Sequence, residues 1–204
     1  MFEKTLYRQV CLFILEADMR KPNARERILE TAGELFFQRG YSEVGINEII
    51  EKAGTAKASF YQHYPSKESL CEAWLQAMHD RSEIFRAELL SSADSPAEKL
   101  ARYFDQLETY MENSQFRGCP YSNTSAVSDE QCCGIIEQIR AHKESIRQFF
   151  RSLAASYFSD SEKAAEMGDR IFVLYSGAAG EAQNLKAMWP VHTARGAALE
   201  ILQN

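Results

Sequence analysis

The sequence predicts an all-α protein with a small N-terminal module of three helices and a larger helical domain behind it. Along most of the 204 residues, apolar side chains recur at spacings of three and four, which is the period of an amphipathic helix. Residues typical of helix N-caps precede several of these segments, and glycine or proline follows them. No internal repeat, low-complexity tract or apolar run of about 18 residues accompanies them, so no membrane partner is expected.

Cysteine, histidine and glycine show no arrangement that predicts a catalytic, cofactor or metal site. The four histidines are scattered and no C-x-x-C pair occurs, so we expect no zinc site. Neither a glycine-rich phosphate loop nor a G-x-S-x-G element is present, and we predict no enzyme activity and no cofactor. Five cysteines, without the spacing of a disulfide framework, indicate a reducing cytoplasm. Glu16 and Asp18 follow the apolar run at 10–15, so no signal peptide is expected.

Charge is distributed unevenly along the chain. The formal net charge is −6, but residues 20–79 contain eight basic and eight acidic side chains and are therefore neutral. The remaining 15 basic and 21 acidic residues supply the whole negative charge. Because affinity for nucleic acid depends on local phosphate contacts rather than on overall charge, the acidic composition does not exclude DNA binding.

Residues 1–19 form a segment whose role the sequence leaves open. Leu6, Val10, Phe13 and Ala17 would share one face of an amphipathic helix. The segment is either an extension without a required role or a helix packed on its own subunit or on a partner. We expect a module at 20–66 and a larger domain at 67–204 to follow it.

The first two helices of the module are delimited by clear signals. The first begins after Asn23, which forms a capping-box pattern with Glu26, and it ends at Gly40. A short second helix has its apolar stripe at positions 46, 49, 50 and 53, and it ends in the turn Ala53-Gly54. A third short helix follows this turn directly, and two short helices joined in this way predict a helix-turn-helix.

The third helix carries small, polar and aromatic side chains instead of an apolar stripe. Its outward candidates are Lys57, Ala58, Ser59, Tyr61, Gln62 and His63. Such a surface suits the floor and walls of a DNA major groove better than a protein core. Phe60 and Tyr64, between and after these residues, are expected to be buried.

The larger domain is predicted to be a series of longer helices. Ser95, Pro96 and Glu98 combine an N-cap, a proline at the first helical position and a capping-box acid. Pro190 is expected to interrupt the chain before the last helix. The predicted helices cover about 67–90, 96–113, 122–127, 128–157, 160–188 and 192–202.

Residues 25–75 resemble the DNA-binding domain of TetR-family transcriptional regulators. The first helix ends with the pattern F-x-x-x-G-[YF], at 36–41, and the second ends with A-G. The third runs into [FL]-Y-x-[HY]-[FY]-x-[SN]-K-[ED]-x-L, at 60–70. One departure is Ala56, where the family usually has Ser or Thr to cap the recognition helix, so Thr55 is the candidate cap.

The resemblance implies that recognition helices of two subunits enter the major groove of a palindromic double-stranded DNA operator. Lys57 then suits a guanine edge or a phosphate and Gln62 an adenine, whereas Tyr61 and His63 suit phosphates. Lys67, with the free N–H groups of the next helix, would form an anion site. The DNA-binding residues implied in this way are Asn47, Lys57, Ala58, Ser59, Tyr61, Gln62, His63 and Lys67.

The resemblance also implies that the larger domain senses an effector and forms a homodimer. In the family, the last two long helices pair with their symmetry mates, and small residues at 176–180 and 194–198 would permit the close approach. The chain is thus predicted to be a repressor that an unknown small-molecule effector releases from its operator. The operator, the effector and the sign of regulation stay open.

Gly118-Cys119 resembles an element before the sixth helix in a TetR subgroup, some of whose members sense oxidants or electrophiles through this thiol. Arg117 and the adjacent helix start favour a reactive thiolate, with Cys132-Cys133 as candidate resolving partners. The alternatives are a buried structural Cys119, a thiol-dependent enzyme, and a helical small-molecule-binding protein without operator binding. The residues predicted for ligand or redox sensing are Cys119, Tyr110, Phe116, Asn123 and Tyr175.

Overall fold

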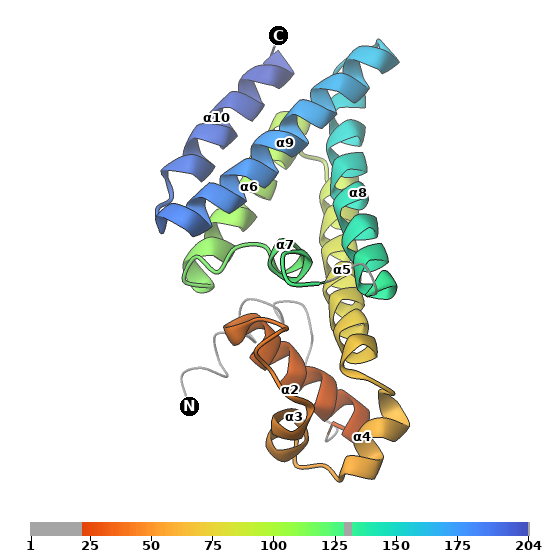
Figure 1. Cartoon of the computed structure of the whole chain (residues 1–204). Helices are drawn as coiled ribbons and strands as arrows, with labels where there is room; N and C mark the ends of the chain where they lie inside the picture. The colour runs from red at the N-terminus through yellow and green to blue at the C-terminus, as the bar shows by residue number, and fades with distance from the viewer. Residues whose placement is uncertain (1–21, 129–131, 204) are drawn as a thin grey trace. The chain divides into compact units, whose positions relative to one another are not determined.

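The computed structural model of the chain describes residues 22–128 and 132–203, and all regular secondary structure in these ranges is helical. The helices are labelled α2 to α10 in Figure 1. The all-α prediction is confirmed, whereas the helix predicted within residues 1–19 lies outside the described residues. Within the described ranges, no helix has both the length and the hydropathy that a membrane crossing requires.

The described residues form two compact units, whose boundary differs from the one expected at residue 66. The first unit holds the described residues up to Arg81 and within Pro120–Arg140. The second holds Ser82–Cys119 and the residues from Ala141 onward. The start of the long helix after the helix-turn-helix therefore belongs with the DNA-binding module, because its apolar side chains complete the core of that module.

Two long helices contribute to both units. They are α5 (Lys67–Ser91) and α8 (Cys133–Ala155), and α8 begins later than the predicted start at 128. The short helix α7 (Pro120–Ser125) belongs to the first unit. Within that unit the buried Tyr121 hydroxyl donates to the Leu75 carbonyl of α5 at 2.8 Å, which fixes α7 to α5.

The helix-turn-helix consists of α2 (Ala24–Arg39), α3 (Ile46–Lys52) and α4 (Lys57–His63), which pack against one another (Figure 1). The predicted capping box at the start of α2 is present. The Glu26 N–H donates to Asn23 Oδ1 at 3.0 Å, and the Asn23 N–H donates to Glu26 Oε2 at 2.8 Å. Two amides that would otherwise lack partners are satisfied in this way.

Aromatic and aliphatic side chains form the core of the first unit. The Phe36 ring lies 5.6 Å from that of Tyr41 and 5.5 Å from that of Trp74, so α5 shares this core. Burial of each such side chain stabilises the fold by about 1.5–3 kcal/mol relative to exposure. Fully buried residues of the unit include Ile28, Ile49, Phe60, Leu70 and Leu75.

The start of α4 corrects one detail of the prediction. Ala56, not Thr55, is the N-cap residue, and no side chain caps the first turn. The Thr55 N–H donates to the Ile50 carbonyl at 3.2 Å, whereas its hydroxyl is buried without a hydrogen-bond partner. Thr55 therefore closes the turn through its backbone, but it lies one residue too early for its hydroxyl to cap the helix.

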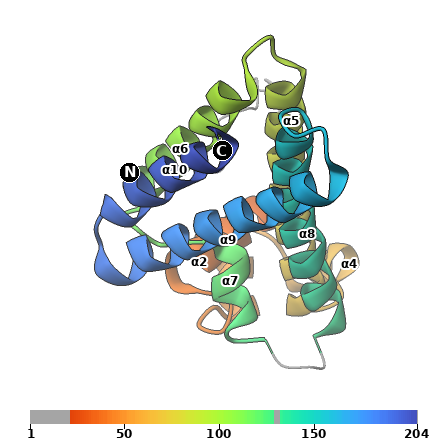
Figure 2. The same ribbon diagram turned by 90° about the horizontal axis from the view of Figure 1, so that it is seen from above.

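In the second unit, α6 (Pro96–Asn113), α9 (Ser161–Leu185) and α10 (Trp189–Gln203) pack against one another, as Figure 2 shows from above. The predicted capping box of Ser95 and Glu98 starts α6. Side chains from these helices and from α5 and α8 form one core. Its fully buried members include Leu89, Leu100, Phe104, Met111, Phe150, Leu153 and Ile171.

The end of the chain differs from the prediction at Pro190. The expectation that Pro190 interrupts the chain before a helix at 192 is wrong, because α10 already begins at Trp189. Proline is tolerated in a first turn, where its missing N–H would have no intrahelical partner in any case. Helix α9 ends at Leu185, earlier than expected, and Lys186 follows it in the left-handed region with φ 50°.

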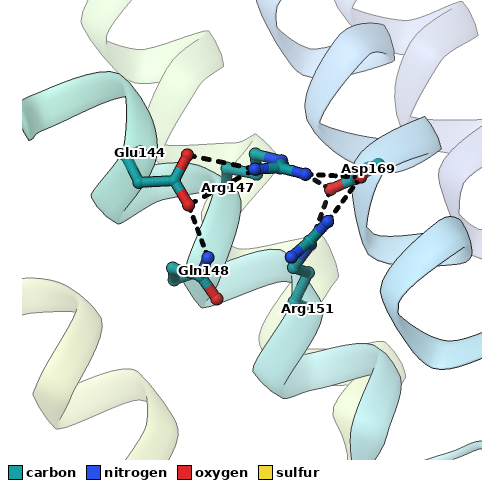
Figure 3. A network of polar contacts seen from close by, with 5 residues as sticks. All are labelled: Glu144, Arg147, Gln148, Arg151 and Asp169. Carbon is teal, nitrogen blue, oxygen red and sulfur yellow. Dashed lines mark hydrogen bonds and ion pairs between the residues drawn. The ribbon is translucent and has the colours of Figure 1, made fainter. Parts of the chain in front are cut away.

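A charged cluster joins α8 to α9 within the second unit (Figure 3). The Asp169 carboxylate accepts hydrogen bonds from Arg151 at 2.7 Å and from Arg147 at 2.7 and 2.8 Å. The two helices approach so closely at Gly168 that a Cβ there would lie only 2.6 Å from Arg151 Cα. Hydrogen bonds from Arg151 and Arg147 hold the pKa of the Asp169 carboxyl well below its ordinary range.

Candidate functional site

Helix α4 presents one polar face outward and holds a single ring inward. Phe60 is fully buried, while Tyr61 keeps 43% of its surface exposed. Ser59 and His63 are half-buried beside them. The exposed side chains of α4 are Lys57, Ala58, Tyr61 and Gln62, all of which were predicted to face DNA.

Contacts from α2 fix the two ends of the helix-turn-helix. Arg27 Nε donates to the Ala53 carbonyl at the end of α3, at 3.2 Å. The buried Tyr64 at the end of α4 donates its hydroxyl to the Arg25 carbonyl at 3.3 Å, and Arg25 lies over the Tyr64 ring. Burial raises the pKa of the Tyr64 phenol, which therefore stays neutral and able to donate. The recognition helix is thus held by backbone contacts that leave its polar face uncovered.

Asn47 is exposed on α3, beside a group of charges that the sequence did not single out. Glu48 forms ion pairs with Arg39 at 2.7 Å and with Lys52 at 3.0 Å. Hydrogen bonds from Lys52 and Arg39 lower the pKa of the Glu48 carboxyl, so it stays ionised and its charge is balanced locally. The balance matters at a DNA-facing surface, where an uncompensated carboxylate would repel phosphate.

Lys67 has a structural role that the sequence did not predict. Its ammonium donates to the carbonyl oxygens of Tyr41 and Val44, at 3.0 and 3.2 Å, and lies 4.4 Å from the centre of the Tyr41 ring. These contacts hold the loop between α2 and α3. The phosphate contact predicted for Lys67 would add to these contacts and stays a prediction.

A loop at 114–119 carries the second group of predicted residues. Gln115 and Phe116 have φ of 53° and 56°, in the left-handed region that non-glycine residues rarely adopt, and Gly118 has φ 72°. The Tyr110 hydroxyl donates to the Gly118 carbonyl at 2.8 Å, and Lys186 Nζ donates to the Phe116 carbonyl at 2.9 Å. The loop is therefore held in a strained conformation by α6 and by the end of α9.

Cys119 ends this loop and contacts a lysine that no sequence pattern singles out. Lys143 Nζ, on α8, donates to Cys119 Sγ at 3.5 Å, and both residues are half-buried. The two residues are 24 positions apart and share no motif, so only the fold reveals the pair. Among the other thiols, Cys71, Cys132 and Cys133 belong to the first unit.

Tyr175 lies in an aromatic cluster inside the second unit. Its ring is 5.1 Å from Tyr103 and 5.5 Å from Phe150. The guanidinium of Arg86, only 2% exposed, donates to the Tyr103 hydroxyl at 3.5 Å and to Ser145 Oγ at 3.0 Å. Burial raises the pKa of both phenols, and the nearby Cys119 thiol adds to the effect.

The ligand residues predicted from the sequence are only partly brought together. Tyr110, Phe116 and Cys119 meet at the loop of the second unit, and Tyr175 belongs to the core beside it. Asn123 lies on α7 in the first unit and is not part of this group. Among the described residues, no cluster of three or more His, Cys, Asp or Glu side chains is arranged to hold a metal ion.

Known proteins match the N-terminal module in sequence and most of the chain in fold. Residues 28–74, from α2 into α5, match the family model of bacterial regulatory proteins of the tetR family. A TetR-family transcriptional regulator from Streptomyces coelicolor, SCO4454, has the same fold over 88% of this chain and 94% of its own, with a TM-score of 0.80 and 22% identity. Residues 28–74 thus form a module of the tetR family, and the chain shares the fold of a TetR-family regulator.

Two curated relatives of the chain are described as HTH-type, that is helix-turn-helix, regulators. An uncharacterised HTH-type transcriptional regulator in the lacX 3′ region of Lactococcus lactis is 30% identical over 50% of this chain and 53% of its own length. The HTH-type transcriptional repressor NemR of Escherichia coli is 28% identical over 58% of this chain and 59% of its own. The chain thus spans between half and three fifths of the length of these two curated relatives.

Proposed function

We propose that this TetR-family regulator is a homodimeric repressor that binds a palindromic operator through α4. The observation that carries the proposal is the exposed polar face of α4, backed by the fully buried Phe60. Lys57 and Gln62 reach base edges, while Tyr61 and His63 contact phosphates. The sign of regulation is supported by the name of NemR, a transcriptional repressor.

The dimer forms through α9 and α10. Val173 is 67% exposed on α9, and Leu185 and Trp189 are 51% and 59% exposed at the turn between the two helices. A Cβ at Gly177 or Gly196 would meet nothing within 4 Å, so a second pair of helices has room to approach closely. A two-fold axis at this face would hold two recognition helices about 34 Å apart, one turn of DNA.

A change in the second unit releases the operator. Either a small-molecule effector bound near the aromatic cluster of Tyr103 and Tyr175, or modification of Cys119, favours a conformation with a different spacing of the recognition helices. A tenfold change in occupancy requires about 1.4 kcal/mol of preference for that conformation. The contact between Lys143 and Cys119 favours the thiol route, because it places a polar neighbour beside a thiol that is only half-buried.

The test of operator binding is gel retardation with the protein's own upstream DNA. We expect a dimer in size-exclusion chromatography and retardation that weakens steeply as salt rises, because phosphate contacts release counterions. A monomer that ignores duplex DNA at low salt contradicts the proposal. Retention of a small ligand by such a monomer would favour a ligand-binding protein without operator binding.

The thiol route is tested with Cys119→Ser. We expect the variant to bind the operator like the wild type but to stay bound when a peroxide or N-ethylmaleimide is added. Cys133→Ser, which changes an exposed thiol of the first unit, is the control and should be released like the wild type. Equal release of the Cys119→Ser variant rejects the thiol route and leaves operator binding untouched.

A further inference from the structure

Cys119 and Lys143 place two different nucleophiles side by side. The Nζ–Sγ distance is 3.5 Å, and both side chains remain half-buried rather than sealed in the core. A thiol adds to carbonyl carbons, and an amine condenses with them. A pair at this distance can therefore act on the same carbon atom in succession.

The surrounding contacts keep the thiol at this place. Bonds from Tyr110 to the Gly118 carbonyl and from Lys186 to the Phe116 carbonyl hold the loop. The Gln183 side chain lies against Gly118, where a Cβ would collide with it. The partner amine, by contrast, is carried on the flexible four-carbon stem of Lys143. Sulfur is fixed while nitrogen can adjust.

We propose that Cys119 and Lys143 trap a small aldehyde, whose carbonyl carbon becomes a one-carbon bridge between sulfur and nitrogen. In the first step the thiol adds to the aldehyde, forming a carbon–sulfur bond, and its proton passes to the carbonyl oxygen to give a hemithioacetal. In the second step the Lys143 ammonium gives a proton to that hydroxyl, which leaves as water, and the freed amine bonds to the carbon.

The reaction is balanced without an oxidant. One thiol, one ammonium and one aldehyde give one protonated N,S-acetal and one water. A tetrahedral carbon bonded to both atoms holds sulfur and nitrogen closer than 3.5 Å, so the flexible Lys143 stem must bring the amine towards the thiol. The bridge has one carbon because both nucleophiles act on the same carbonyl carbon.

The bridge rests on the proposed function, because it can regulate transcription only if the protein binds an operator. Its chemistry is measurable without DNA. The bridge would tie α8 to the loop ahead of α7, within the second unit, and so fix covalently a segment that the free protein holds by non-covalent contacts. Failure of retardation would reject the regulatory proposal, and failure of bridging would reject only the trap.

The test uses the reduced full chain and formaldehyde as the probe. After excess formaldehyde is removed by gel filtration, the wild type should retain one added carbon atom by non-denaturing mass spectrometry. Its Cys119 should react with iodoacetamide at least about tenfold more slowly than before treatment. Cys132 and Cys133, mapped in the same digest, serve as internal controls and should label as before.

Lys143→Arg is the matched variant. It keeps a cation beside the thiol but cannot form the N,S-acetal, so its hemithioacetal should revert when formaldehyde is removed and Cys119 should label at the untreated rate. Equal protection in Lys143→Arg overturns the role of the lysine. An unprotected Cys119 in the wild type, or a carbon retained equally on other lysines, overturns the trap whatever the variant does.

Discussion

Helix α4 turns one ring, Phe60, into the core and leaves Lys57, Tyr61 and Gln62 to solvent, and no side chain caps its first turn. The loop at 114–119 is built in the opposite way. Its carbonyl groups accept bonds from Tyr110 and Lys186, which come from other parts of the chain. The residues of the candidate DNA site are therefore neighbours in sequence, whereas those of the candidate sensor are brought together by the fold.

The two sites are therefore sensitive to substitution in different ways. On α4, one inward residue, Phe60, lies among outward ones within seven positions, so stability and binding can be changed separately. In the second unit, the residues that hold the structure also position the candidate site. A substitution there is expected to change both properties at once.

The largest effect is expected from Phe60→Ala. Removing a fully buried ring leaves a cavity and should lower the free energy of unfolding by about 3–5 kcal/mol. The measurement is urea unfolding followed by circular dichroism. Tyr61→Ala, on the next position but outward, should change stability by less than about 0.5 kcal/mol. Equal losses in the two variants would mean that the inward and outward faces of α4 are wrongly assigned.

The double variant Lys57→Ala, Tyr61→Ala should separate binding from folding. Each lost contact costs about 1–3 kcal/mol, so operator affinity should fall at least about 100-fold while the dimer and its thermal stability persist. Gel retardation and size-exclusion chromatography give the two readouts. Asp160→Ala, which removes the N-cap of α9, is the control. It should lower stability but leave operator affinity unchanged under conditions in which the protein stays folded. Unchanged operator affinity in the double variant rejects the groove-facing assignment.

The same difference explains what the sequence could predict. Caps and periodicity gave α2 and α6 to the residue, because Asn23, Ser95 and Pro96 act on adjacent backbone. The outward residues of α4 followed from a contiguous pattern. Lys143 and Arg86 could not be selected, since their significance lies in contacts with Cys119 and Tyr103 across turns that no local pattern encodes.

Gly118→Ala should affect the loop through backbone and contact together. At φ 72° an alanine is strained by about 1–2 kcal/mol, and its Cβ also displaces the Gln183 side chain. We expect a loss of that size in thermal unfolding, with faster alkylation of Cys119 because the loop is less firmly held. Gly45→Ala is the control, since its φ is −90° and its Cβ meets nothing within 4 Å. A neutral Gly118→Ala would mean that the loop tolerates a second conformation.

The smallest effect is expected at Asp169, and its size should depend on pH. Because Arg151 and Arg147 lower the pKa of this carboxyl, the ion pairs add stability above its unfolded pKa of about 3.9. That stability is lost as pH falls through the lower folded value. The carboxylate is 35% exposed, so solvent screening limits the cost of Asp169→Asn to about 1 kcal/mol or less at neutral pH.

The measurement is the free energy of unfolding between pH 7 and pH 3. The wild type should begin to lose its advantage over Asp169→Asn below about pH 4, near the unfolded pKa, so the two curves start to approach each other at the acid end of this range. Glu166→Gln removes a fully solvated i,i+4 pair with Arg170, in which both side chains are 58% exposed, and should change stability by less than about 0.5 kcal/mol at every pH. Parallel curves for the wild type and Asp169→Asn would show that packing at Gly168, rather than charge, joins α8 to α9.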